Sequence, residues 1–206
     1  MSTARPFHHG DLKATLARSA AVLLERSGAD ALSIREVARE AGVSSAAPYR
    51  HYPNRDALLA EVARDGFERL HDALMAVEAR QDRRTAFVAR SLAYVRFAQS
   101  NPALYRLMFG ALPGKHRHEG LVEASGRLFA LLDEATGDAD PRQPFRAVGC
   151  WAAIHGLATL ALDGQLEAHL PGVTDDHLLA VLQPLADTYV LCLRDAGQDK
   201  SRVDFR

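Results

Sequence analysis

Apolar residues recur every three or four positions along most of this chain, and that spacing decides what kind of fold it can adopt. In the first such segment, Leu12, Leu16, Ala20 and Leu23 fall on one face of a helix. No stretch of Val, Ile, Thr and aromatic residues alternates polar and apolar side chains as a half-buried strand would. The pattern therefore predicts an all-α protein. The expected helices lie at about 12–27, 33–41, 45–52, 55–80, 83–99, 102–110, 119–136, 142–168 and 174–196.

The composition is that of a soluble globular protein. Of its 206 residues, 48 % are hydrophobic and 25 % are charged, which excludes a disordered chain and a disulfide-dense miniprotein. Cys150 and Cys192 stand in apolar helical segments and are expected to be reduced. The first residues contain no apolar signal region, and no apolar run reaches the roughly 18 residues of a membrane span. We therefore expect a cytoplasmic protein without a membrane partner.

The N-terminal quarter of the chain is basic, although the whole chain is nearly neutral. Residues 1–55 hold eight Lys and Arg against five Asp and Glu, whereas the net charge of the chain is −1. Such a split indicates an anionic partner at the N-terminal end. Chance also explains an excess this small, so the charge alone leaves the partner open.

The second expected helix has clear start and stop signals. Ser33 and Glu36 have the spacing of a capping box, in which each side chain binds the backbone N–H of the other residue. Ala38 is small enough for another helix to approach closely. Gly42 follows as the residue that can adopt the left-handed conformation of a tight turn. The sequence therefore predicts a short helix that ends in a sharp turn.

A third short helix is expected directly after that turn. Pro48 lacks an N–H and is tolerated in the first turn of a helix, which favours Ser45 over Ser44 as the N-cap of a helix that ends at Tyr52. Two short helices joined by a glycine turn form a helix-turn-helix, whose second helix can enter the major groove of DNA. The alternative is an ordinary three-helix core with a polar exterior.

The side chains of the third helix suit contact with DNA. Ala46 can touch a thymine methyl group, and Arg50 can donate two hydrogen bonds to guanine O6 and N7. Tyr49, His51 and Tyr52 offer donors to phosphate oxygens. This concentration of donors favours the DNA-binding hypothesis over the plain core.

Two segments of the chain resemble one known protein family. Residues 32–62, LSIREVAREAGVSSAAPYRHYPNRDALLAEV, resemble the DNA-binding domain of TetR/AcrR-type transcriptional regulators, and residues 8–28 look like the first helix of that domain. In residues 151–166, Trp151, His155 and Gly156 resemble the Trp-His-Gly (WHG) signature of one C-terminal domain class in the same family.

The resemblance implies a fold and a function. It implies an N-terminal three-helix helix-turn-helix DNA-binding domain and a C-terminal helical ligand-binding and dimerisation domain. The protein would be a sequence-specific repressor that binds a palindromic operator in double-stranded DNA as a homodimer and is released by a ligand. Carried over by position, the DNA contacts would come from Ser33, Arg35, Ser44, Ser45, Ala46, Tyr49, Arg50, His51 and Arg55.

The chain departs from the family pattern at two positions. Pro48 replaces the bulky aliphatic residue that is common there, and Arg55 replaces the usual lysine, which keeps the charge but alters the donor geometry. Neither change disturbs the DNA-binding assignment, but both leave the base sequence open.

Four parts of the chain follow from the expected helices and the resemblance. They are a DNA-binding domain at 1–54, a connecting helix at 55–80, a helical ligand-binding and dimerisation domain at 81–198 and a tail at 199–206.

The last two expected helices are candidates for the dimer interface. The helix at 142–168 is rich in Gly and Ala, and the helix at 174–196 has an apolar face too wide for one neighbour. In the family, the last two long helices pair with those of a second copy. The alternative is a monomer that buries both faces internally.

The effector is expected to be small and apolar. Trp151 and His155 are four residues apart on one helix face and could line an apolar site with one polar group. The other interpretation makes Trp151 a core residue and lets His155 bind a backbone carbonyl. The candidate ligand-binding residues are Tyr94, Phe97, Leu107, Met108, Phe109, Phe129, Trp151 and His155.

Enzyme and metal motifs are missing from the sequence. It contains no GxSxG, HExxH, P-loop or GxGxxG motif. His8, His9, His116 and His118 stand in expected loops without Cys or carboxylate partners at metal-ligand spacing. We therefore expect no catalytic residue, no cofactor and no metal site.

Overall fold

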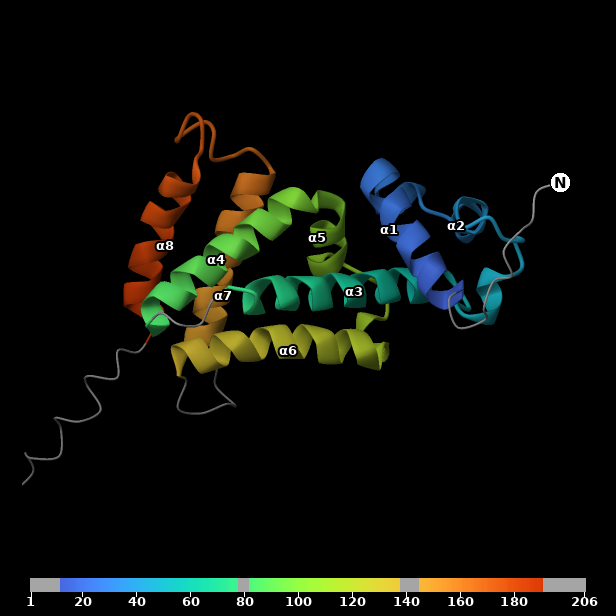
Figure 1. Cartoon of the computed structure of the whole chain (residues 1–206), viewed down its shortest axis with the longest axis horizontal. Helices are drawn as coiled ribbons and strands as arrows, with labels where there is room; N and C mark the ends of the chain where they lie inside the picture. The colour runs from blue at the N-terminus through green and yellow to red at the C-terminus, as the bar shows by residue number, and fades with distance from the viewer. Residues whose placement is uncertain (1–11, 78–81, 138–144, 191–206) are drawn as a thin grey trace, which may run out of the picture. The chain divides into compact units, whose positions relative to one another are not determined.

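The computed structural model describes residues 12–77, 82–137 and 145–190, and all regular structure within these ranges is helical (Figure 1). The prediction of an all-α protein is confirmed. The elements are α1 (Leu12–Ala31), α2 (Ile34–Glu40), the 3-10 helix η1 (Pro48–Arg50), α3 (Arg55–Met75), α4 (Arg83–Ser100), α5 (Pro102–Phe109), the 3-10 helix η2 (Lys115–Arg117), α6 (Glu119–Thr136), α7 (Phe145–Leu162) and α8 (Asp175–Tyr189).

The chain forms two compact units. Unit 1 consists of Met1–Asp72 and Phe97–Leu128, and unit 2 consists of Ala73–Arg96 and Phe129–Arg206. Unit 1 therefore holds α1, α2, η1 and α5, whereas unit 2 holds α7 and α8. The expected domain limits at residues 54, 80 and 198 stay predictions, and the tail at 199–206 lies outside the described residues.

The first three helices of unit 1 enclose an apolar core. α1 buries Leu16 and Leu24 completely, α2 buries Val37, and α3 buries Leu58. Gly28, with a φ of 77°, interrupts α1 near the predicted end of the first helix. Burial of one such side chain contributes about 1.5–3 kcal/mol, so this small core can hold the N-terminal helices together.

The helix expected between α2 and α3 is shorter than predicted. The sequence predicts a helix from Ser45 to Tyr52, but the structure has turns followed by the single-turn helix η1. Three backbone hydrogen bonds of this segment span three residues: Ala47 N donates to Ser44 O at 3.0 Å, Arg50 N to Ala47 O at 3.3 Å and His51 N to Pro48 O at 2.9 Å. This is the spacing of 3-10 turns rather than of an α-helix capped by Ser45. The prediction of Ser45 as the N-cap of an α-helix is therefore wrong.

α3 ends at Met75, whereas the sequence predicts that this helix continues to about residue 80. Leu70 and Leu74 are buried on its inner face. Residues 78–80 of the predicted helix lie outside the described residues.

α7 also ends earlier than the predicted limit at residue 168. Gly164 adopts a φ of 68°, and its N–H donates to Ala161 O at 3.3 Å. Gln165 N donates to Leu160 O at 2.9 Å, which completes a Schellman motif. The sequence signal for this stop was Gly164 itself.

The sequence predicts no apolar run long enough to span a membrane, but α7 is such a run. Its 18 residues have a mean hydropathy of 1.4, so by length and composition alone it could cross a membrane, and 28 % of it is buried. Helices of soluble proteins pass the same test, so this finding is weak support for a span.

Two glycines of unit 1 should respond in opposite ways to alanine. Gly42 has a φ of 69°, and a Cβ there would meet nothing within 4 Å, so Gly42→Ala adds only backbone strain and should lower the free energy of unfolding by about 1 kcal/mol. A Cβ at Gly126, inside α6, also meets nothing within 4 Å, so Gly126→Ala should raise this free energy by about 0.5–1 kcal/mol. Urea unfolding of each variant measures both changes. If both substitutions raised the free energy of unfolding, or both lowered it, the result would contradict the role assigned to Gly42 in the turn.

Candidate nucleic-acid interface

The turn between α2 and η1 is fixed by local hydrogen bonds. Glu36 N donates to Ser33 Oγ at 3.2 Å, and Ser33 N donates to Glu36 Oε2 at 3.0 Å, so the capping box is confirmed. At the other end of α2, Gly42 N donates to Arg39 O and Val43 N donates to Ala38 O, which is a Schellman motif. The chain therefore leaves α2 in a single defined direction.

Most of the expected DNA-contact residues lie on the surface of this segment. Tyr49 is 53 % exposed, His51 and Ser33 are half-buried, and Arg55 is considered below. The remaining five, which are exposed, are Arg35, Ser44, Ser45, Ala46 and Arg50. Their side chains are available to a partner.

Tyr52 has a structural role. It is only 2 % exposed, and its hydroxyl donates to Lys13 O of α1 at 3.0 Å. Burial raises the pKa of Tyr52 far above its usual value, so the hydroxyl remains a donor. The prediction that Tyr52 donates to phosphate is wrong, because its side chain instead holds the end of the η1 segment against α1.

Arg55 also binds within the protein. Its Nε donates to Leu32 O at 2.9 Å, and its guanidinium donates to Ala29 O. The side chain thereby ties the start of α3 to the segment that joins α1 and α2. A phosphate contact from Arg55 stays a prediction.

Sequence reasoning missed the residue that caps α5. The carboxylate of Glu25, on α1, accepts from Leu104 N at 2.9 Å and from Ala103 N at 3.2 Å. Asn101 is the expected N-cap by position, but its side chain accepts from Arg69 at 2.8 Å and makes no cap hydrogen bond. A carboxylate from a distant helix thus satisfies the first N–H groups of α5.

Loss of this cap should destabilise the protein. Glu25→Ala leaves two N–H groups of α5 without their acceptor, and we expect the free energy of unfolding to fall by about 1 kcal/mol. Glu40→Ala is the matched control, because Glu40 makes only an exposed pair with Arg26 at 3.5 Å and should change it by about 0.5 kcal/mol or less. Equal losses in urea unfolding would contradict a capping role for Glu25.

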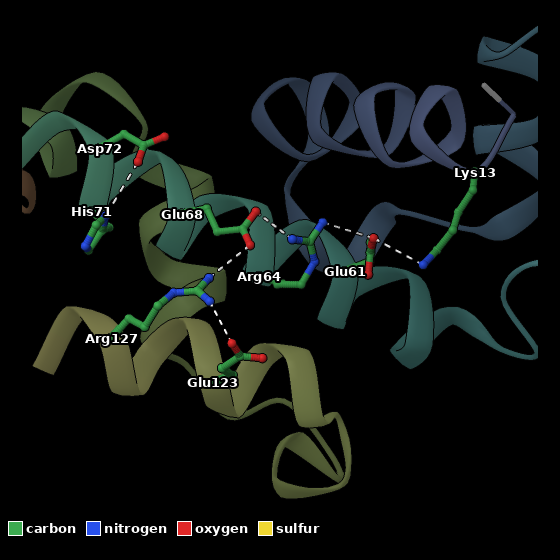
Figure 2. A network of polar contacts seen from close by, with 8 residues as sticks. All are labelled: Lys13, Glu61, Arg64, Glu68, His71, Asp72, Glu123 and Arg127. Atoms are coloured by element: carbon green, nitrogen blue, oxygen red, sulfur yellow. Dashed lines mark hydrogen bonds and ion pairs between the residues drawn. The ribbon is translucent and has the colours of Figure 1, made fainter. Parts of the chain in front are cut away.

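A chain of ion pairs runs along α3 from α1 to α6 (Figure 2). Glu61 lies 3.4 Å from Lys13 and 3.1 Å from Arg64. Arg64 also binds Glu68 at 2.5 Å, and Glu68 lies 3.2 Å from Arg127 of α6. Burial alone would raise the pKa of Glu61, but the hydrogen bond and charge of Arg64, with Lys13, outweigh burial and lower it. Glu61, Arg64 and Glu68 are three and four residues apart on α3, so the pairs among them have the spacing of neighbours on one helix face. The contacts with Lys13 and Arg127 join distant segments and are not predictable from local spacing.

Four candidate ligand-binding residues come together in unit 2. The hydroxyl of Tyr94 lies 3.0 Å from His155 Nδ1. The Trp151 ring lies 5.6 Å from the His155 ring and 6.3 Å from Phe129, between ring centroids. Burial lowers the pKa of His155, which favours the neutral imidazole. We call Tyr94, Phe129, Trp151 and His155 the aromatic cluster.

The other candidates lie in unit 1. Phe109 packs edge-on against Phe67 at 5.2 Å, and Met108 lies against Gly66. Phe97 lies 6.0 Å from the Arg69 guanidinium, and Leu107 is buried. The structure therefore does not bring these four residues into the aromatic cluster, and a ligand-binding role for them stays a prediction.

Family models match both halves of the chain. Residues 16–62 match the model described as bacterial regulatory proteins of the tetR family. Residues 87–185 match a model described as a tetracyclin repressor-like C-terminal domain. The narrower Trp-His-Gly class stays a prediction.

Individual proteins are similar to the chain in sequence or in structure. The chain is 34 % identical to the HTH-type transcriptional regulator Rv1816 of Mycobacterium tuberculosis, over 72 % of this chain and 81 % of that protein. A protein of unknown function from Rhodococcus sp. RHA1 has a similar structure, with 38 % identity, a TM-score of 0.71 and coverage of 90 % of this chain and 97 % of that chain. A TetR family transcription regulator from Marinobacter aquaeolei VT8 shares the fold at 18 % identity, with a TM-score of 0.64 and coverage of 88 % and 96 %.

These matches, together with a capped helix, a glycine turn and an exposed Tyr49 and Arg50, agree on one assignment. Members of the family are DNA-binding transcription factors rather than enzymes, and they are typically dimers. The chain belongs to the TetR family of transcriptional regulators.

Proposed function

We propose that this regulator is a repressor that binds a palindromic operator as a homodimer and is released by a small ligand. The observation that carries the proposal is the η1 segment. It presents Tyr49 and Arg50 outward, while the Tyr52 hydroxyl and the α2 turn fix its position. Tyr49 and Arg50 supply exposed hydrogen-bond donors at a fixed position, and the nearby Ser45 and Ala46 are small enough for close approach to DNA. Both properties suit the major groove.

The nine expected contact residues divide into two kinds. Arg50 and Ala46 would contact base edges, because a guanidinium matches guanine and a methyl group matches thymine. Ser33, Arg35, Ser44, Ser45, Tyr49, His51 and Arg55 would position the protein, mainly on phosphates.

The Tyr49 hydroxyl should contribute to DNA affinity. Its side chain is 53 % exposed, so Tyr49→Phe removes a donor without disturbing the core. We expect operator binding to weaken by about 0.5–1.5 kcal/mol while circular dichroism and thermal stability stay unchanged. Tyr189→Phe is a control on α8, away from the η1 segment in sequence. Unaltered affinity of the Tyr49→Phe variant in fluorescence anisotropy would remove this hydroxyl from the contacts.

The outward faces of α7 and α8 would form the dimer interface. Large apolar side chains there are exposed, namely Phe145 at 74 %, Val148 and Leu160 at 46 % and Val181 at 40 %. The opposite side of α8 is occupied, because Asp175 pairs with Arg96 and Asp187 pairs with Arg84, both on α4.

A second copy of the chain is the occupant that fits this apolar surface. Exposed apolar area on two adjacent helices is typical of an oligomer interface, and a two-fold axis buries the same patch on both subunits. Such a pairing would also place two η1 segments on one face of DNA, about 34–36 Å apart. It accounts for the apolar character of α7 without a membrane, which agrees with a cytoplasmic regulator.

Release would follow from binding of a small ligand within the C-terminal part, for which the aromatic cluster of unit 2 is the candidate site. A ligand can shift the protein away from DNA only if it binds the DNA-incompetent arrangement more tightly than the competent one.

Fluorescence anisotropy with DNA from upstream of the protein's own gene tests the proposal. We expect an affinity at least about a thousandfold greater than for the same DNA with its palindrome scrambled, and a steep loss of affinity with added salt. Equal affinity for both DNAs at every salt concentration would contradict sequence-specific regulation.

A further inference from the structure

Among the described residues, three charged side chains of unit 2 have a buried polar atom without a hydrogen-bond partner, and two of them stand near the aromatic cluster in sequence. These two are Arg90, through Nε, and Asp133, through Oδ1. Arg146 Nε has the same status, but the Arg146 guanidinium already donates to Tyr189 O at 2.9 Å. Buried polar atoms are nearly always paired in folded proteins, so Arg90 and Asp133 require an explanation.

Both side chains lie one helical turn from a member of the aromatic cluster. Arg90 precedes Tyr94 by four residues on α4, and Asp133 follows Phe129 by four residues on α6, so each shares a helix face with its aromatic neighbour. Tyr94 and Phe129 both contact residues of α7, namely His155 and Trp151.

The faces of α4 and α6 that carry Arg90 and Asp133 are therefore both turned toward α7. The first turn of α4 also touches the last turn of α6, because Arg83 donates to Glu134 O at 3.1 Å. All of these residues belong to unit 2, in which Figure 1 shows α7 close to both helices.

We propose that Arg90 and Asp133 are the polar groups of the effector site, and that the effector is an uncharged, planar aromatic molecule whose polar edge both accepts and donates hydrogen bonds. This inference rests on the proposed ligand-released function and narrows its effector from an apolar molecule to a polar-edged one. The acceptor would pair with Arg90 Nε and the donor with Asp133 Oδ1, while the aromatic plane would lie against Trp151 and Phe129.

The charges of the site support an uncharged effector. Arg90 and Asp133 carry opposite charges, so a carboxylate ligand would meet Asp133 unfavourably, and an ammonium ligand would meet Arg90 unfavourably. The neutral form favoured for His155 adds no net charge. A pure hydrocarbon would leave both buried atoms unpaired.

Three probes of one ring size test the class of effector. They are 2-naphthamide, which has an acceptor and a donor, 2-naphthoate, which is an anion with acceptors only, and naphthalene, which has neither. Isothermal titration calorimetry with the full chain should show 2-naphthamide binding at least about tenfold more tightly than either of the others. The chain has a single tryptophan, so the one indole N–H signal in its NMR spectrum should shift during titration. Naphthoate or naphthalene binding as tightly as the amide, no binding of the amide, or an unmoved Trp151 signal would overturn the proposal.

Two variants separate binding from structure. Arg90→Met and Asp133→Leu each remove one unpaired buried atom, so both should raise the melting temperature of the ligand-free protein while weakening 2-naphthamide at least about tenfold. Asp65→Leu, at an exposed position inside α3, is the control and should change neither quantity. A merely structural role predicts loss of stability with unchanged amide affinity, and that result would overturn the proposal.

Operator binding, measured on the same samples, separates a failure of this effector inference from a failure of the proposed regulator function. A protein that binds its operator but fails the three-probe test loses only this inference. A protein that fails both loses the regulator proposal as well.

Discussion

Replacing Val148 with glutamate is expected to convert the proposed dimer into monomers and to abolish operator binding. Val148 is 46 % exposed on the outward face of α7, three residues after Phe145, which is 74 % exposed. Two-fold symmetry would bury the new carboxylate twice in one apolar interface, without a partner of opposite charge. An unpaired buried charge costs about 3–5 kcal/mol, and the symmetry applies this cost to both subunits.

Size-exclusion chromatography with light scattering measures the change directly. Val122→Glu is the matched control, because Val122 is 48 % exposed on α6, outside the proposed interface, and its variant should remain dimeric. Anisotropy on the same samples should show loss of operator binding only for the monomeric variant. A Val148→Glu protein that remains dimeric would remove α7 from the interface.

Removing the Arg50 side chain should cost most of the base discrimination at one operator position. Arg50 is exposed on η1, and in the proposed complex it donates two hydrogen bonds to a guanine. Arg50→Ala should therefore lose about 1–3 kcal/mol of affinity for the operator and much less for random DNA.

Arg39→Ala is the control for charge. Arg39 is exposed in the last turn of α2 and is not among the expected DNA contacts, so its removal should weaken operator and random DNA by similar, small amounts. If Arg50→Ala weakens both DNAs equally, Arg50 contacts phosphate rather than a base.

Features that the sequence predicts well depend on neighbouring residues. The capping box of Ser33 and Glu36 and the turn at Gly42 involve residues within one or two helical turns, so their letters are sufficient. Gly164 is the same kind of signal, because a glycine in the left-handed conformation ends α7 as Gly42 ends α2.

Features that the sequence could not give depend on contacts between distant segments. The hydrogen bond from Tyr52 to Lys13 O and the cap that Glu25 provides for α5 join residues far apart in the chain. Tyr52 looked like a phosphate donor because only its chemistry, and not its burial, is visible in the sequence.

The division of the ligand candidates has the same origin. The sequence predicts Tyr94, Phe109 and Trp151 as ligand-binding candidates without showing which core each one joins. The fold places Phe109 against Phe67 in unit 1 and groups the others around His155 in unit 2.

Methylation interference at guanine N7 tests the central claim most directly, because N7 lies in the major groove, where the η1 segment would bind. On DNA from upstream of the gene, we expect methylated guanines to block the wild-type protein in two symmetric half-sites, about one helical turn apart, and Arg50→Ala to lose that sensitivity at one guanine of each half-site. Binding that no methylated guanine disturbs would contradict the account.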